Sequence, residues 1–187
     1  MNFPTNKKNV AIIDFEATCS KGKEVPFKEM EIIEFACIVI DRELQEIGRF
    51  DRFVKPVRHP TLTEFCTNLT TITQEQVDSG SKFSEVLLDF SKFIKPFDPL
   101  FASWGRYDKN QLIKDCTYHE VEYPFDDEHL DIKRWVPQFY NFSRPKGIGR
   151  MLKRLRLKFE GTPHRGIDDV HNIVRILKQT RETILQG

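Results

Sequence analysis

The chain has 187 residues, of which 39% are hydrophobic and 30% charged, enough apolar material for one packed core and too much for a disordered chain. No run of residues approaches the roughly 20 apolar positions of a membrane span, and the first residues lack the apolar core of a signal peptide, so membrane insertion and secretion are not expected. The net charge of +1 by itself indicates no charged partner.

Three strands are expected in the first third of the chain. Residues 9–15 and 32–40 form apolar runs, the second rich in β-branched side chains, and both are typical of buried strands. Residues 47–54 alternate in polarity and stop before Pro56, which favours a third strand in a meander with the first two.

After residue 60 the hydrophobic period changes to that of helices. Residues 83–94 place apolar side chains at spacings of three and four, and Thr73 with Gln76 forms a capping-box pair that predicts a short helix before them. This order of strands and helices predicts an α/β fold with a mixed sheet covered by helices, in a single domain. The remaining expected elements are a strand over 99–104 and helices over 107–117 and 168–184.

The four Cys residues lie 18, 29 and 50 residues apart, so no pair has the spacing of a metal site or a redox motif. We therefore expect reduced thiols in a cytoplasmic protein.

Charge is unevenly distributed along the chain. Residues 115–131 hold seven acids and no Lys or Arg, whereas residues 144–158 hold seven bases and no acid. The basic stretch predicts either a face that binds a polyanion or the solvated face of a helix, and both interpretations stay open at this stage.

Several carboxylates occur where strands and helices are expected to meet. Asp14 and Glu16 end the first strand, and strand alternation sends both side chains to one side of the sheet, where a buried pair needs protons or cations to neutralise it. Asp108 lies at the start of a helix, and Asp168 and Asp169 lie at the start of the last one. Each acid alone fits a cap or a solvated position, but convergence of four at one sheet edge predicts two metal ions.

Five strings in order and spacing resemble the DnaQ-like DEDDh exonucleases, and within them the Eri branch, the 3′ exonucleases of histone mRNA and small interfering RNA. The resemblance covers about residues 9–180, which implies one RNase H-like exonuclease domain over 1–187 with short terminal extensions. The strings are IIDFEATC (12–19), EIIEF (31–35), LTTITQEQV (69–77), SWGRYDKNQL (103–112) and PHRGIDD (163–169).

The resemblance implies a two-metal hydrolysis of phosphodiesters, with Mg²⁺ as the metal and Mn²⁺ able to substitute. His164 corresponds to the general base of the family, which takes a proton from water. In the family, four residues separate the His from the Asp, and this spacing selects Asp169 over Asp168. Asp168 is then expected to be a helix cap or a first-turn acid. The four implied metal ligands are Asp14, Glu16, Asp108 and Asp169.

The resemblance also implies contacts with the terminal nucleotide. Aromatic side chains at Phe65 and Tyr107 would stack on the last base, which needs no sequence readout. Tyr107 stands where a Trp is usual, and Thr71 stands where related sequences have Gly, a change expected to narrow access. The floor and wedge of the pocket correspond to Phe15, Ala17, Thr18 and Ile33, each of which fits a core position equally well.

These observations together predict a metal-dependent 3′-to-5′ exoribonuclease. It is expected to be a cytoplasmic monomer that trims single-stranded RNA ends or short 3′ overhangs, prefers RNA to DNA, and releases 5′-mononucleotides. Two alternatives stay open: a DNA 3′-5′ exonuclease or proofreading subunit, and a catalytically silent RNA-binding module on the same fold.

Overall fold

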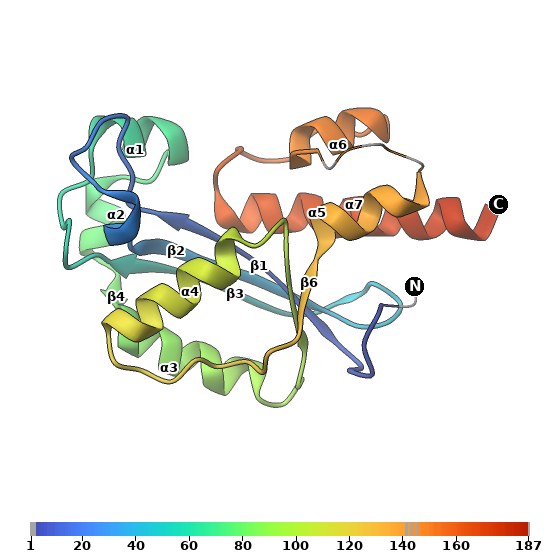
Figure 1. Ribbon diagram of the computed structural model, residues 1–187, viewed down its shortest axis with the longest axis horizontal. Helices are drawn as coiled ribbons and strands as arrows, with labels where there is room; N and C mark the ends of the chain where they lie inside the picture. Colours follow the sequence, from blue (N-terminus) through green and yellow to red (C-terminus); the bar gives the residue numbers. More distant parts are fainter. Residues whose placement is uncertain (1–2, 141, 143, 145, 187) are drawn as a thin grey trace.

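The fold is built on one six-stranded mixed sheet. The computed structural model describes residues 3–140, 142, 144 and 146–186. The strands lie in the order β4-β3-β2-β1-β5-β6 (Figure 1). Their bounds are β1 (Val10–Ala17), β2 (Ile32–Ile40), β3 (Glu46–Lys55), β4 (Ser81–Lys82), β5 (Leu100–Ser103) and β6 (His129–Asp131).

The first three strands form an antiparallel meander, and the later strands pair in parallel. β1 pairs antiparallel with β2 and parallel with β5, so β1 lies near the middle of the sheet with neighbours on both sides. β5 pairs parallel with β6, and β3 pairs parallel with the short β4. A register shift between Glu16 and Ala17 in the β1–β2 ladder bends the strand where it ends, a place where such irregularities commonly re-aim side chains.

Helices cover both faces of the sheet (Figure 1). α3 and α4 pack on one face, and α6 and α7 on the other. The helices are α1 (Glu64–Thr70), α2 (Gln74–Asp78), α3 (Phe83–Ile94), α4 (Tyr107–Tyr118), α5 (Ile132–Trp135), α6 (Ile148–Arg154) and α7 (Gly166–Gln186), with short 3₁₀ helices at Phe27–Glu29 and Val136–Phe139.

Strand alternation divides the core into two main layers. Val10 and Ile12 of β1 pack toward α6 and α7, whereas Ala11 and Ile13 pack toward α3 and α4. Both faces of β1 and β2 are buried, which is why their sequences read as continuous apolar runs. The two acids of β1 lie on the α7 side of this division.

The predicted mixed-sheet α/β fold is confirmed, and the expected strands and helices are present within a few residues. The capping box at Thr73 is formed in both directions, since its hydroxyl accepts from the Gln76 amide and the Gln76 side chain accepts from the Thr73 amide. Sequence patterns did not predict α1, α5, α6, β4 or β6. Among the described residues, no helix is both long enough and apolar enough to cross a membrane.

Candidate active site

Three carboxylates meet where β1 ends. Ligand oxygens of Asp14, Glu16 and Asp169 all lie within 4.8 Å of one another. Glu16 and Asp169 are 9% and 8% exposed, and Asp14 is half-buried. Two of the acids come from alternate positions of one strand and the third from the first turn of α7, so the sheet and the helix build the cluster together.

A close approach of α7 to the sheet delivers Asp169. A Cβ atom at Gly166 would lie 2.9 Å from both the Asp14 carbonyl oxygen and the Ala36 side chain, so only glycine lets the helix begin there. Asp168 points elsewhere, and its Oδ2 accepts from the Thr162 amide at 2.8 Å. The structure therefore places Asp169 in the cluster and Asp168 as a first-turn acid that holds the preceding loop.

The cluster is electrostatically uncompensated. Burial, reinforced by the charges of Asp108, Asp169 and Glu16, raises the pKa of Asp14 well above its usual value. Burial and neighbouring carboxylates raise the pKa of Glu16 to about 9, and burial is the main cause that raises the pKa of Asp169 to about 7. Within the described residues, no ion pair involves any of the three. Oxygen donors that repel one another suit a hard divalent cation, so the residues fit a Mg²⁺ or Mn²⁺ site.

Asp108 is buried next to this cluster but is not part of the 4.8 Å group. It lies in the first turn of α4, and its Oδ1 accepts from the Phe15 amide at 3.1 Å. Burial raises the pKa of Asp108 to about 6, while hydrogen bonds from the amides of Phe15 and Asp108 and from the Ser103 side chain oppose the rise. Its metal-ligand role stays a prediction.

His164 lies at the mouth of the same cleft. Its side chain is exposed, and its amide donates to Asp169 Oδ2 at 2.8 Å. Its φ of +62° is in the left-handed region, a conformation that bulky residues adopt when surrounding contacts enforce it. The cleft has a volume of about 370 Å³ and is lined by Asp14, Glu16, Trp104, Ile148, Gly149, Phe159, Pro163, His164 and Asp169.

The residues predicted to contact a nucleotide differ in how exposed they are. Phe65 and Tyr107 are 40% and 36% exposed, as stacking residues need to be. Phe15 and Ile33 are not at the surface, because Phe15 packs in the core toward α3 and α4, and Ile33 packs with residues of α1 and α2. Their contact with a nucleotide stays a prediction.

Ala17 and Thr18 are buried where the chain leaves β1. The Thr18 hydroxyl accepts from the Glu31 amide at 2.9 Å, and the Thr18 amide donates to the Glu31 carbonyl at 2.8 Å. Thr18 therefore ties the end of β1 to the start of β2, and its role toward a nucleotide stays a prediction.

The sequence did not predict Phe27 as a neighbour of Tyr107, and it did not reveal the backbone conformation of Thr71, whose expected narrowing of access stays a prediction. Phe27 was not predicted, yet it is 72% exposed and its ring centroid lies 6.3 Å from that of Tyr107. Thr71 ends α1 with a φ of 60°, and its amide donates to the Thr67 carbonyl. This left-handed cap favours glycine, which gives a backbone reason for the Gly in related sequences.

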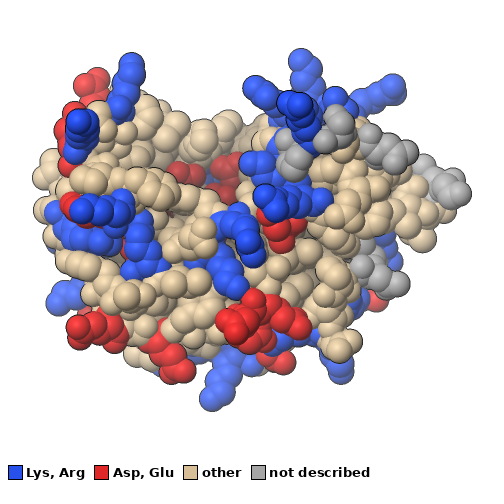
Figure 2. Space-filling view, viewed as in Figure 1, with Lys and Arg blue, Asp and Glu red and all other residues tan. Residues whose placement is uncertain are grey.

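The basic stretch borders the cleft. Ile148 and Gly149 of α6 line the cleft, and Lys and Arg gather over α6 beside a hollow with acidic atoms at its floor (Figure 2). Within the described residues, none of the seven bases of 144–158 forms an ion pair, and all except the half-buried Lys146 are exposed. The described bases of this stretch are therefore solvated, and binding of a polyanion there stays a prediction.

Sequence comparison places these features among known proteins. The exonuclease family model matches residues 11–177. Human 3′-5′ exoribonuclease 1 is 33% identical over 177 residues, which cover 89% of this chain and 50% of the relative. The 3′-5′ exonuclease eri1 of Schizosaccharomyces pombe is 32% identical, with 95% of this chain and 71% of the relative covered. The chain spans about half the length of most of the curated relatives it matches.

Solved structures agree with this placement. The nuclease domain of 3′hExo, described as a DEDDh family member bound to rAMP, superimposes with a TM-score of 0.86 at 30% identity, over 98% of this chain and 94% of that one. A 3′-exonuclease in a structure of histone mRNA stem-loop recognition gives the same TM-score at 31% identity, over 98% of this chain and 66% of that one. With its RNase H-like sheet and its acids at the end of β1, the chain belongs to the DEDDh exonuclease family, in the Eri-type branch.

Proposed function

We propose that the chain is a metal-dependent 3′-to-5′ exoribonuclease that trims single-stranded RNA ends or short 3′ overhangs and releases 5′-mononucleotides. The observation that carries the proposal is the convergence of Asp14, Glu16 and Asp169, which have no cationic partner among the described residues, in a cleft that His164 also lines. Carboxylates that cluster for a structural reason are expected to be paired with Lys or Arg. Carboxylates that cluster for catalysis are expected to be unpaired, so that their negative charge can bind a metal ion.

Asp14, Glu16 and Asp169 would hold divalent cations, with Asp108 beside them completing a set of four acids for two Mg²⁺ ions. When bound, such ions neutralise the charge that develops on a scissile phosphate and its leaving oxygen. Mn²⁺ has the same preference for oxygen ligands and is expected to substitute.

His164 would act as the proton acceptor for the attacking water. Its side chain lines the cleft with the acids, and its backbone amide donates to Asp169 Oδ2, so the hydrogen bond ties the His164 backbone to the acid cluster. Imidazole is the side chain best suited to accept a proton near neutral pH. The exposed rings of Phe65 and Tyr107 would stack on the terminal base, which requires no particular sequence.

RNA is the preferred substrate in this proposal. Support comes from the relatives, several of which are named exoribonucleases, and from the basic surface over α6. That surface continues from the wall of the cleft and would hold phosphates upstream of the terminal nucleotide.

The test compares RNA and DNA oligomers of identical sequence, each labelled at the 5′ end, with Mg²⁺ and with a chelator. We expect products shortened one nucleotide at a time from the 3′ end of RNA, slower shortening of DNA, and none with the chelator. Asp14→Asn, which keeps the shape of the side chain but removes its charge, is the matched control. Binding of RNA without shortening would favour a silent binding module, and faster shortening of DNA would reverse the substrate assignment.

A further inference from the structure

Another buried acid beside the cluster, Glu34, has a different environment. Glu34 of β2 is fully buried and lies directly opposite Glu16 in the β1–β2 register. Its Oε1 accepts from Arg165 Nε at 3.2 Å and from Arg165 Nη2 at 2.9 Å, and its Oε2 accepts from the Gly166 amide at 2.8 Å. Glu34 is thus fully engaged with the chain segment that starts α7, and its oxygens are not directed to the metal cluster.

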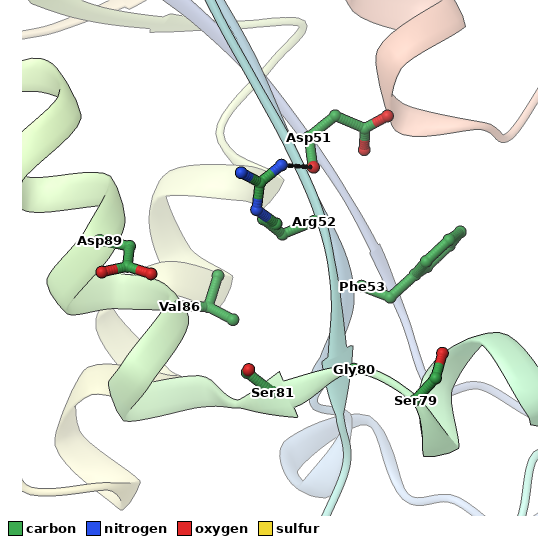
Figure 3. Close-up of a pocket in the computed structure, with 8 residues that line it drawn as sticks. All are labelled: Asp51, Arg52, Phe53, Ser79, Gly80, Ser81, Val86 and Asp89. Atoms are coloured by element: carbon green, nitrogen blue, oxygen red, sulfur yellow. Dashed lines mark hydrogen bonds between the residues drawn. The ribbon is translucent and has the colours of Figure 1, made fainter.

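The Arg165 side chain packs against residues of β2 and β3. Its guanidinium carbon is 5.4 Å from the centre of the Phe53 ring, and Phe53 pairs with Glu34 across the two strands. Asp51, two residues earlier on β3, lies on the same side of that strand as Phe53, whereas Arg52 lies on the other (Figure 3). The hydrogen bonds to buried Glu34, with the Phe53 ring and the charge of Asp51 nearby, restrict the geometry of the half-buried guanidinium.

The backbone of Arg165 is fixed as well. Its carbonyl accepts from the amides of Asp168 and Asp169, both at 2.9 Å, and Gly166 packs against the sheet. His164 directly precedes this anchored residue and has the left-handed backbone described above. Its exposed side chain forms no hydrogen bond within the described residues, so its position depends on the anchored backbone beside it.

We propose that Glu34 and Arg165 are a positioning pair that holds the segment 163–169 against β2, so that His164 and Asp169 face Asp14 and Glu16. The expected effect of this pair on the rate of nucleotide release rests on the proposed function. Its expected effect on the structure of 163–169 does not. Neither side chain contacts substrate in this account; both act through the backbone of the residues between them. The pairing also keeps the Arg165 charge on Glu34, away from the acids that await a metal ion.

The chain offers a matched control in a second half-buried arginine, Arg58. Arg58 is 15% exposed at its side chain, lies 3.9 Å from Glu31 Oε1 and 3.3 Å from Asp115 Oδ1, and stacks on the ring of Tyr118. Arg58 resembles Arg165 because it is similarly exposed, pairs with buried acids and lies over an aromatic ring. Because it contacts no residue of 163–169, its loss should lower stability without moving His164.

The first experiment measures nucleotide release from an RNA oligomer with Mg²⁺ in Arg165→Gln, Arg165→Lys and Arg58→Gln. We expect Arg165→Gln to lower kcat about 10- to 100-fold with KM changed less than about threefold, since support for the catalytic groups is lost and substrate contacts remain. Arg165→Lys should recover part of kcat, because it keeps the positive charge but lacks the planar guanidinium that donates two hydrogen bonds to Glu34. Arg58→Gln should keep kcat within about threefold. Equal losses in Arg165→Gln and Arg58→Gln would overturn the inference.

A second measurement does not depend on activity. Amide hydrogen exchange should become faster at His164 and Gly166 in Arg165→Gln and in Glu34→Gln, and stay unchanged there in Arg58→Gln. If the wild type releases no nucleotide, the proposed function fails while this exchange pattern still tests the pair. Unchanged exchange over 163–169 in a folded Arg165→Gln or Arg165→Lys protein would mean that the pair positions nothing.

Discussion

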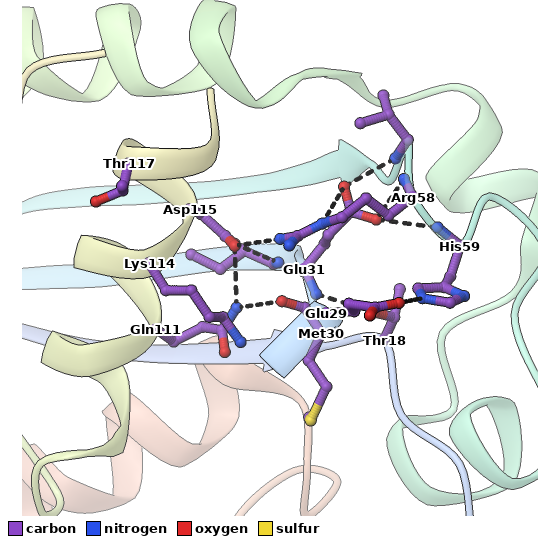
Figure 4. Close-up of polar contacts among 12 residues, drawn as sticks. Thr18, Glu29, Met30, Glu31, Arg58, His59, Gln111, Lys114, Asp115 and Thr117 are labelled. Atoms are coloured by element: carbon purple, nitrogen blue, oxygen red, sulfur yellow. Dashed lines mark hydrogen bonds and ion pairs between the residues drawn. The ribbon is translucent and has the colours of Figure 1, made fainter. Parts of the chain in front are cut away.

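Two acid-rich regions of this protein lie at the same end of the sheet and are built in opposite ways. In the first, Glu31 accepts from the amides of Val57, Arg58 and His59, and Asp115 accepts from Ile32, Arg58 and Gln111 (Figure 4). In the second, Asp14, Glu16 and Asp169 face one another with no ion pair within the described residues.

The difference is visible in how burial affects each acid. Burial raises the pKa of Asp115 to about 6, but the Ile32 amide, Gln111 and nearby Lys114 and Arg58 oppose the rise. Burial raises the pKa of Glu16 to about 9, and every neighbouring charge adds to the rise. A paired acid holds the fold together, whereas an unpaired buried cluster costs stability and is retained for what it binds.

The largest expected effect separates the two regions by activity. Asp169→Asn should lower kcat for nucleotide release about 10⁴-fold or more, because it removes a ligand charge from a metal site that supplies several kcal/mol to the transition state. Asp115→Asn should keep most activity. Asp168→Asn is the neighbouring control and should also stay active, since Asn can still accept from the Thr162 amide. Loss of activity in Asp168→Asn with an active Asp169→Asn would move the ligand by one residue.

The next effect concerns the proton acceptor beside the unpaired cluster. His164→Ala should lower kcat about 10² to 10⁴-fold with little change in KM, because the acids remain and only the proton acceptor is lost. Steady-state rates over pH 6 to 9 test this, and a wild-type kcat in the variant would make His164 structural.

A smaller effect is expected from the basic surface over α6. Arg150→Gln with Lys153→Gln should raise KM for a long single strand about tenfold and flatten its salt dependence, because fewer counterions are released on binding. A dinucleotide should be unaffected, since it has no upstream phosphates for Arg150 and Lys153 to bind. Lys92→Gln on α3 with Lys95→Gln at its C-cap, on the other face of the sheet, is the control. Equal losses on both substrate lengths would show that α6 supports the fold instead.

The smallest effect is on stability, and its sign should differ between the regions. Glu16 has a folded-state pKa raised to about 9, so its contribution to stability is full below its unfolded value near 4.5 and is lost as pH rises toward 9. Without metal, Glu16→Gln should therefore raise the free energy of unfolding at pH 8 by about 1 kcal/mol.

Glu31→Gln makes the same chemical change in the paired region and should instead destabilise by about 1 to 3 kcal/mol, because an amide group would face three backbone donors. Urea unfolding of both variants in the presence of a chelator measures the two signs. The same sign in both variants would contradict the division of the acids into paired and unpaired sets.

The sequence predicted the parts of this fold that have a strong local signal. The runs of β1 and β2 are buried on both faces, and α3 places Phe83, Val86 and Phe90 on one stripe. The capping box at Thr73 needs only residues three apart. By contrast, α1 and α6 have seven residues each and β6 has three, too few for a hydrophobic period to emerge.

Parts of the site followed from the sequence, and parts could not. Alternation put Asp14 and Glu16 on one side of the sheet, and family spacing singled out Asp169. The pairing of Glu34 with Arg165 joins residues 131 positions apart, and no local pattern reports such a contact. Phe27 was missed because an exposed aromatic in a loop has no signal until its neighbour Tyr107 is known.

The most direct test of the unpaired cluster is calorimetric titration with Mn²⁺ of the wild type, Asp14→Asn and Asp115→Asn, without nucleic acid. If the unpaired acids are retained for metal ions, the wild type and Asp115→Asn should bind Mn²⁺ alike, and Asp14→Asn should bind at least about tenfold more weakly. Equal Mn²⁺ affinity in the wild type and Asp14→Asn, or no binding by the wild type, would contradict the account.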